Sequence, residues 1–161
     1  MSEAQAVLRD PTEWLAAEIA GYHSLLNLLE SEQEALRAAD ADRLAQTTQP
    51  KIVQIGALQE RAAMRAKALR ARGLTENAAG MSTLLGESAH PESARAAWNT
   101  LLGVAAHAQR QNSLNMRLAS VQQRYVDRAI AALWRAAGCD STYGADGRSR
   151  HHAAPRTLAS I

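Results

Sequence analysis

Few residues in this chain are of types that could carry out chemistry, and they are scattered. Cys139, His151 and His152 are metal-ligand types, but their spacing matches no zinc module. His23 and His107 have no Cys or Asp at ligand spacing in the helical segments that contain them. We therefore expect neither a metal site nor a cofactor.

The motifs of known catalytic sites are also missing from the sequence. It contains no glycine-rich phosphate loop, no nucleophile elbow and no HExxH signature. The acidic residues Glu30, Glu32 and Glu34 are interpreted as the solvated face of a helix. An all-helical enzyme of the chorismate-mutase kind would need basic groups that converge, whereas Arg61 and Arg65 are spread along a rod. We expect a protein that is not an enzyme.

A basic set along one predicted helix could contact phosphate. It consists of Arg110, Arg117, Arg124, Arg128 and Arg135. Neither aromatic interleaving nor a groove-reading motif accompanies these residues. The formal net charge of +2 is too small to indicate nucleic acid by itself. We expect no nucleic-acid partner, and a salt-dependent gel shift would reveal one.

The composition favours helices throughout the chain. Ala and Leu make up about a third of the 161 residues, Phe is absent and β-branched residues are scarce. A chain of this length is expected to form one domain. The predicted fold is all-α, an elongated antiparallel helical bundle or coiled coil of three long helices with a flexible C-terminal tail. The domain is expected at 10–138, its helices at about 11–39, 42–72 and 91–137, and the tail at 139–161.

The first two helices are predicted to pair as a hairpin. Residues 10–42 sum to a charge of −7 and residues 43–72 to +6, so the two segments attract each other. On the first helix, Leu25, Leu29 and Leu36 are expected to make the contact. On the second, the expected apolar stripe is Leu44, Thr48, Ile52, Ile55, Leu58, Ala62 and Leu69.

Proline and glycine mark the course of the second helix. Pro50 falls inside its stripe, so either it kinks one continuous helix, which we prefer, or the helix starts near Gln49. Gly73 followed by Leu74 fits a Schellman motif at the end of this helix. The connector at 75–90 includes an apolar stretch at 81–85 that could form a helical turn and cap the bundle.

The C-terminal half of the third helix has more apolar surface than one neighbour can cover. A narrow seam through Leu114 and Leu118 widens after Tyr125. The residues expected to bind a partner are Leu118, Val121, Tyr125, Val126, Ile130, Leu133 and Trp134. Two interpretations are open: the segment 81–85 and the hairpin end bury this surface, or a partner helix does.

Three features indicate the cytoplasm. The chain has one cysteine, which fits a reducing compartment. It has no run of about 18 apolar residues that would span a membrane. Its N-terminus lacks the charged and apolar regions of a signal peptide.

Several stretches resemble the FlgN family of flagellar export chaperones, over about residues 12–148. In the first hairpin they are Leu25-Leu26-Asn27-Leu28-Leu29-Glu30-Ser31-Glu32, Ala35-Leu36, 40–44, and the run from Lys51 to Arg72-Gly73-Leu74. In the later part they are Asn112-Ser113-Leu114-Asn115, the segment 129–133, and Thr142-Tyr143-Gly144 with Asp146-Gly147-Arg148. The most specific of these is the Asn-x-x-Asn pair followed by the Tyr-Gly segment.

The resemblance implies a cytoplasmic chaperone that binds hook-associated proteins of the hook–filament junction and hands them to the flagellar type III export apparatus. We expect helix-in-groove capture of an amphipathic terminal helix, with Tyr143 as a contact to the client or the export gate. Without a client, a monomer or a weak homo-oligomer is expected. The alternative is a structural coiled-coil adaptor that self-associates through the same surface.

Overall fold

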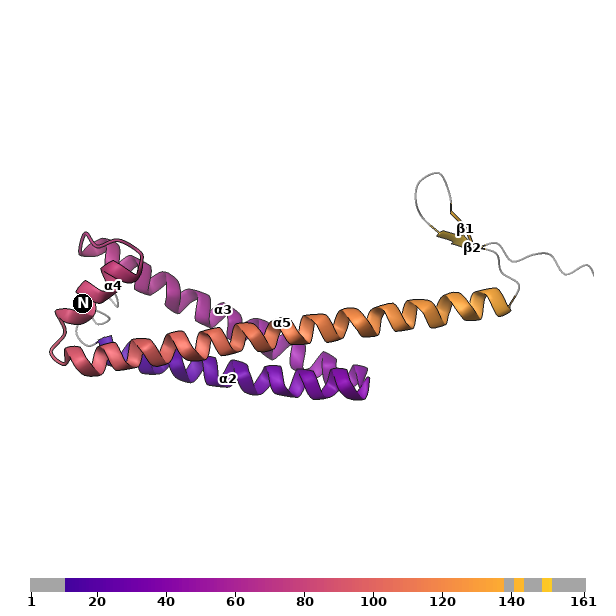
Figure 1. Ribbon diagram of the computed structural model, residues 1–161, viewed down its shortest axis with the longest axis horizontal. Helices are drawn as coiled ribbons and strands as arrows, with labels where there is room; N and C mark the ends of the chain where they lie inside the picture. The colour runs from indigo at the N-terminus through magenta and orange to yellow at the C-terminus, as the bar shows by residue number, and fades with distance from the viewer. Residues whose placement is uncertain (1–10, 138–140, 144–148, 152–161) are drawn as a thin grey trace, which may run out of the picture. The chain divides into compact units, whose positions relative to one another are not determined.

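The computed structural model describes residues 11–137, 141–143 and 149–151, in two compact units, Met1–Leu118 and Ala119–Ile161. Its helices are α2 (Pro11–Ala38), α3 (Ala41–Ala71), α4 (Ala78–Gly86) and α5 (Pro91–Ala136), drawn in Figure 1. The helix α5 supplies residues to both units. The described helices agree with the predicted helical bundle, but the count of three helices is not exact, because the apolar stretch at 81–85 belongs to a fourth, short helix, α4.

Two short strands lie in the C-terminal segment that is predicted to be a flexible tail. These are β1 (Ser141–Tyr143) and β2 (Ser149–His151), which pair antiparallel with Tyr143 opposite Ser149. No sequence pattern indicates this pairing. Most of 139–161, including Cys139 and His152, lies outside the described residues. The flexibility of the tail therefore stays a prediction.

The first unit contains α2 and α3 as an antiparallel hairpin. Ala39 closes α2 with a left-handed φ of 52°, and the N–H groups of Ala39 and Asp40 bond back to the last turn at 3.2 and 3.0 Å. The carboxylate of Asp40 then accepts from the N–H of Arg43 at 2.9 Å and caps α3. One tight turn therefore ends one helix and begins the next.

The end of α3 has the geometry of the predicted Schellman motif. Gly73 has a φ of 68°, and its N–H donates to the carbonyl of Arg70 at 2.9 Å. The N–H of Leu74 donates to the carbonyl of Leu69 at 3.0 Å, and Leu74 packs on the same buried cluster as Leu69. Between its two ends α3 runs through Pro50 as a single helix.

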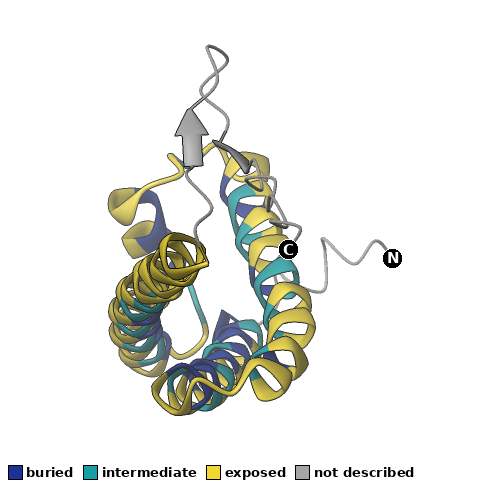
Figure 2. Ribbon diagram, turned by 90° about the vertical axis from the view of Figure 1, so that its right-hand side faces the viewer, coloured by how far each residue is buried: buried dark blue, intermediate teal, exposed yellow. Residues whose placement is uncertain are grey.

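Two buried clusters hold the first unit together, and the facing sides of its helices are correspondingly dark in Figure 2. One cluster joins α2, α3 and α5 through Leu25, Leu26, Leu29, Leu58 and Ala108. The other includes α4 and has as buried members Leu15, Leu69, Met81, Leu84, Leu85, Ala94 and Leu101. Burying each large aliphatic side chain contributes about 1.5–3 kcal/mol. The clusters are therefore the main source of stability in this unit.

The helix α4 reaches its place in this cluster through a tight approach to the preceding loop. Asn77 caps α4 by accepting from the N–H groups of Ala79 and Gly80 at 3.0 and 3.1 Å. A Cβ on Gly80 would lie 1.9 Å from the carbonyl oxygen of Thr75. Only glycine fits at this position.

The predicted apolar stripe of α3 is wrong at two residues. Ile52 is 55% exposed and Thr48 is exposed, while Thr47 is buried. The side of α3 that faces α2 includes polar residues in their place. One of them, Gln54, donates from Nε2 to the carbonyl of Gly21 at 2.8 Å. The buried side of α3 differs from the predicted stripe because Lys51 and Gln54 have polar partners on α2, which hydrophobic spacing alone does not indicate.

None of the described helices is both long enough and apolar enough to cross a membrane.

Candidate functional site

The surface predicted to bind a partner lies on the part of α5 that belongs to the second unit. None of the described residues from 119 to 137 is buried. The large apolar side chains in this segment form what we call the α5 apolar surface. Its members are Val121, Tyr125, Val126, Ile130, Leu133 and Trp134, which are 54, 75, 48, 47, 69 and 39% exposed. Leu118, the other residue predicted for this surface, is half-buried and ends the first unit.

The α5 apolar surface covers a broad part of the helix circumference. At about 100° per residue, Val121 lies at one edge and Trp134 at the other, so the arc spans roughly 220°. The segment forms a helix without burial because Ala, Arg, Gln and Leu, all good helix formers, predominate in it. A hydrogen bond of 2.9 Å from Gln123 to Asp127 adds local support. This segment of α5 can therefore be helical without packing against another element.

The interpretation in which the segment 81–85 and the hairpin end bury this surface stays a prediction, although the side chains of 81–85 are already packed within the first unit. Met81, Leu84 and Leu85 belong to the buried cluster at α4, which contains no residue beyond Val104. Ile130 and Leu133 meanwhile remain 47 and 69% exposed. The second interpretation, a partner helix on the α5 apolar surface, stays a prediction.

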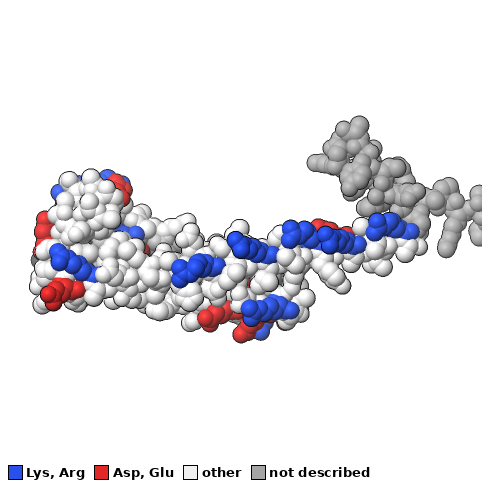
Figure 3. Space-filling view, viewed as in Figure 1, with Lys and Arg blue, Asp and Glu red and all other residues white. Residues whose placement is uncertain are grey.

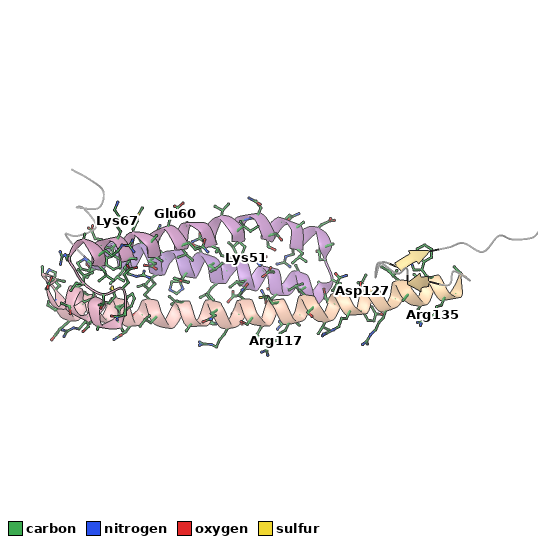
Figure 4. The ribbon with its side chains drawn as sticks, turned by 90° about the horizontal axis from the view of Figure 1, so that it is seen from above. Lys51, Glu60, Lys67, Arg117, Asp127 and Arg135 are labelled. Atoms are coloured by element: carbon green, nitrogen blue, oxygen red, sulfur yellow. The ribbon has the colours of Figure 1, made fainter. Side chains whose placement is uncertain are left out.

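A polar contact inside the first unit joins three helices. Asn115 of α5 is 2% exposed, and its Nδ2 donates to the carbonyl of Leu29 at 2.7 Å and to a carboxylate oxygen of Glu32 at 2.9 Å. Lys51, which extends from α3, pairs with the other oxygen of Glu32 (Figure 4). Glu32 is 8% exposed, so its assignment to a solvated face is wrong. Its charge is tolerated because both neighbouring helices supply donors.

A second buried ion pair lies nearer the start of α2. Arg65 of α3 pairs with Glu18, whose residue is 2% exposed. The guanidinium carbon of Arg65 lies 5.3 Å from the ring centre of Trp98 on α5, which is cation–π geometry. Burial and the Glu18 charge raise the pKa of Tyr22 above its ordinary 10.0, while Arg65 acts in the opposite direction. Glu18 and Glu32, the two buried carboxylates of the hairpin, thus each form an ion pair between α2 and α3.

An apolar groove on the first unit was not indicated by the sequence. It has a volume of about 480 Å³ and is lined by residues of α2, α3 and α5: Tyr22, Leu25, Leu29, Ile55, Leu102, Ala105, Ala106, Ala108, Gln109 and Asn112. Leu102 is 50% exposed within it. In the sequence, only the alanines at 105, 106 and 108 could have indicated this groove. They do not stand out in a chain that is rich in alanine throughout.

The other sequence-predicted positions bring no further chemistry together. Within the described part of the chain, no three His, Cys, Asp or Glu residues lie close enough to hold a metal ion. Tyr143 lies on β1. Cys139 and His152 fall outside the described residues, so the arrangement of the three metal-ligand types near the C-terminus is not tested.

Comparisons with known proteins match this chain to one family. The family model for the FlgN protein matches residues 7–151. The crystal structure of a flagella synthesis protein FlgN from Pseudomonas aeruginosa is similar in fold, with a TM-score of 0.64 and 24% sequence identity. The similarity covers 74% of this chain and 90% of that one. Curated protein sequences include no significant match.

Proposed function

The chain belongs to the FlgN family, and from this membership we propose that it is a non-enzymatic export chaperone for flagellar proteins. Family membership supports a role in flagellum assembly. In our proposal the protein acts in the cytoplasm, binds an amphipathic terminal helix of hook-associated proteins and delivers them to the type III export apparatus. Tyr143 is proposed as a contact to the client or the export gate.

One observation carries the client-binding part of this proposal, namely the exposure of the α5 apolar surface. Six large apolar side chains lie on one helix and are 39–75% exposed. Isolated exposed apolar residues are ordinary, but a contiguous apolar arc of this breadth is typical of a binding surface. A helix laid along it would be held at positions three and four residues apart, the pattern of helix-in-groove recognition.

The expected affinity suits a protein that must release its client. Full burial of a large apolar side chain contributes about 1.5–3 kcal/mol, and these side chains have about half of their area left to bury. Six of them therefore supply roughly 5–9 kcal/mol before costs. Lost translational freedom and side-chain ordering take back about 4 kcal/mol or more. Apolar contact alone gives weak and reversible binding.

The test places a carboxylate in the middle of the surface by Ile130→Asp. A matched control is Ile52→Asp, because Ile52 on α3 is similarly exposed, at 55% against 47%. Binding is measured by fluorescence anisotropy with labelled peptides from the terminal helices of hook-associated proteins. We expect Ile130→Asp to weaken binding at least about tenfold, since a charge would enter an apolar contact, while the control binds normally.

Circular dichroism of both variants completes the experiment. We expect both to keep the helical content of the wild type. If Ile130→Asp unfolds the protein and the surviving folded fraction binds normally, the surface is part of the core and the proposal fails. Light scattering of the client-free protein tests the self-associating adaptor: a stable dimer that Ile130→Asp dissociates would favour that alternative.

A further inference from the structure

Three arginines border the α5 apolar surface in the second unit, and we call them the arginine edge: Arg124, Arg128 and Arg135. All three are exposed, and none forms an ion pair with a described residue. Basic side chains follow one another along this part of α5 in Figure 3. The only acidic residue between 119 and 137 is Asp127, which accepts a hydrogen bond from Gln123. Within the described part of the chain, no carboxylate compensates the positive charge of this edge.

The arginine edge lies on one side of the apolar arc. At about 100° per residue, the three arginines fall within roughly 40° of one another and adjoin Val121. Beyond the opposite edge of the arc, next to Trp134, lie Asp127 and Ser120. Asp127 and Arg135 both extend from this part of α5 (Figure 4). The surface is thus basic along one border only.

In the hairpin of the first unit, cations along one helix pair with carboxylates along the facing helix. Lys51 and Arg65 of α3 are fourteen residues apart and pair with Glu32 and Glu18 of α2, which are also fourteen residues apart. Cations and carboxylates thus repeat at multiples of seven on facing helices, the spacing of charges that flank a coiled-coil seam. Arg128 and Arg135 are seven residues apart, and Arg117 of the first unit precedes Arg124 by the same interval in sequence. Within the arginine edge, Arg128 and Arg135 have this seven-residue interval and Arg124 precedes Arg128 by one helical turn, but no described carboxylate pairs with them.

Other occupants fit this surface less well. A second copy would bring its own arginines to the seam and no matching carboxylates, and like charges at these positions oppose pairing. A membrane-bound helix carries a strongly charged polar face with cations beside both borders of its apolar side, whereas Asp127 lies at the opposite border here. A nucleic acid would contact the arginines through phosphates and leave the apolar side chains in water.

We propose that the occupant of the α5 apolar surface is an acidic amphipathic helix whose carboxylates, spaced four and seven residues apart along one border, pair with Arg124, Arg128 and Arg135. This inference rests on the proposed function and adds the chemistry by which a client is distinguished. Apolar contact supplies most of the affinity, and the arginine edge selects acidic helices and rejects basic ones.

Three synthetic helical peptides with one apolar face test the proposal on the full chain. They differ only at three border positions, four and seven residues apart, which are all Glu, all Gln or all Lys. Three exposed pairs give an expected preference of about tenfold for the Glu peptide over the Gln peptide, and the Lys peptide binds weakest. Raising the salt concentration should reduce the preference.

Charge reversal of the edge, R124E/R128E/R135E, should invert the order so that the Lys peptide binds best. The matched control R61E/K67E/R95E changes the net charge equally at exposed residues outside the surface and should keep the wild-type order. Equal affinity for the Glu and Lys peptides, or an order that the reversal leaves unchanged, overturns the inference. The inference is also overturned if the protein binds vesicles of phosphatidylglycerol, or RNA, and binds none of the three peptides.

The two proposals fail in different ways in this experiment. If all three peptides bind alike and Ile130→Asp abolishes their binding, the charge inference fails while apolar docking on α5 stands. If the Glu peptide is preferred but Ile130→Asp has no effect on any peptide, the arginine edge binds acidic helices while the proposed docking on the apolar surface is wrong.

Discussion

The carboxylate of Glu32 depends on both of its neighbours to be tolerated at its buried position. Lys51 balances its charge, and Asn115 supplies a hydrogen bond of 2.9 Å. The side chain of Lys51 is 18% exposed and that of Glu32 is 10% exposed, so water screens the pair only in part. Removing one partner leaves a poorly solvated charge, which costs more than the intact pair contributes.

We expect Lys51→Met to destabilise the first unit by about 3 kcal/mol, because it removes one partner of a buried ion pair and leaves the other without its counter-charge. The double variant Glu32→Leu/Lys51→Met should be closer to the wild type than Lys51→Met, since it leaves no buried charge. Urea denaturation followed by circular dichroism measures both. This account would be contradicted if the double variant lost as much free energy of unfolding as Glu32→Leu and Lys51→Met lose together.

Among the helices, α2 and α3 end in the same way but with different residues. Each places a left-handed residue after its last turn, with φ of 52° at Ala39 and 68° at Gly73. A side chain in this conformation costs about 1 kcal/mol, and glycine avoids the cost. The α2 end is therefore the less favourable of the two.

Exchanging glycine and alanine at the two helix ends should have opposite effects. Ala39→Gly is expected to stabilise the protein by about 0.5–1 kcal/mol, and Gly73→Ala to destabilise it by about 1 kcal/mol. A Cβ at Gly73 meets no atom within 4 Å, so the second effect reports backbone strain and not a clash. Thermal and urea unfolding of the two variants provide the measurement, and changes of the same sign would refute it.

The long helices were predictable from the sequence, because leucine spacing and capping residues mark them independently. Asp40 before α3 and Gly73 after it both act as the sequence indicates. The side of α3 that faces α2 was less predictable, since Lys51 and Gln54 point to buried partners while Ile52 is exposed. Polarity patterns cannot show which polar residue will find a partner on another helix.

The candidate site was predictable only in its apolar part. The spacing of Val126, Ile130 and Leu133 indicated a second face on α5, and these residues are indeed 47–69% exposed. The arginines beside them were visible in the sequence as a basic set. The selectivity that we propose for them could not be inferred there, because the proposal depends on which cations already have carboxylate partners, and only the structure shows those pairs.

For the molecule as a whole, the buried clusters lie in one compact unit and the proposed binding surface in the other. The buried clusters lie in Met1–Leu118, whereas none of the described residues from 119 to 137 is buried. A helix without packed side chains draws its stability from local propensity and is expected to open more readily than the bundle.

A chain that ends at Leu118 should therefore remain folded, with a thermal midpoint within a few degrees of that of the full protein. It should also lose binding to the client peptides, because it lacks the α5 apolar surface. Differential scanning calorimetry and anisotropy measure the two properties. A midpoint lowered by about ten degrees or more would show that the second unit stabilises the first.

The side-chain amides of Asn115 and Gln54 both donate to main-chain carbonyls of α2, at 2.7 and 2.8 Å. A carbonyl acceptor is present whatever side chain its residue carries. Substituting Leu29 by another apolar residue would therefore leave the bond from Asn115 intact and would require no compensating change at Asn115. Contacts of this kind fix the register of two helices without coupling their substitutions. Pairwise covariation among related chains would be blind to them, even where they decide how the helices meet.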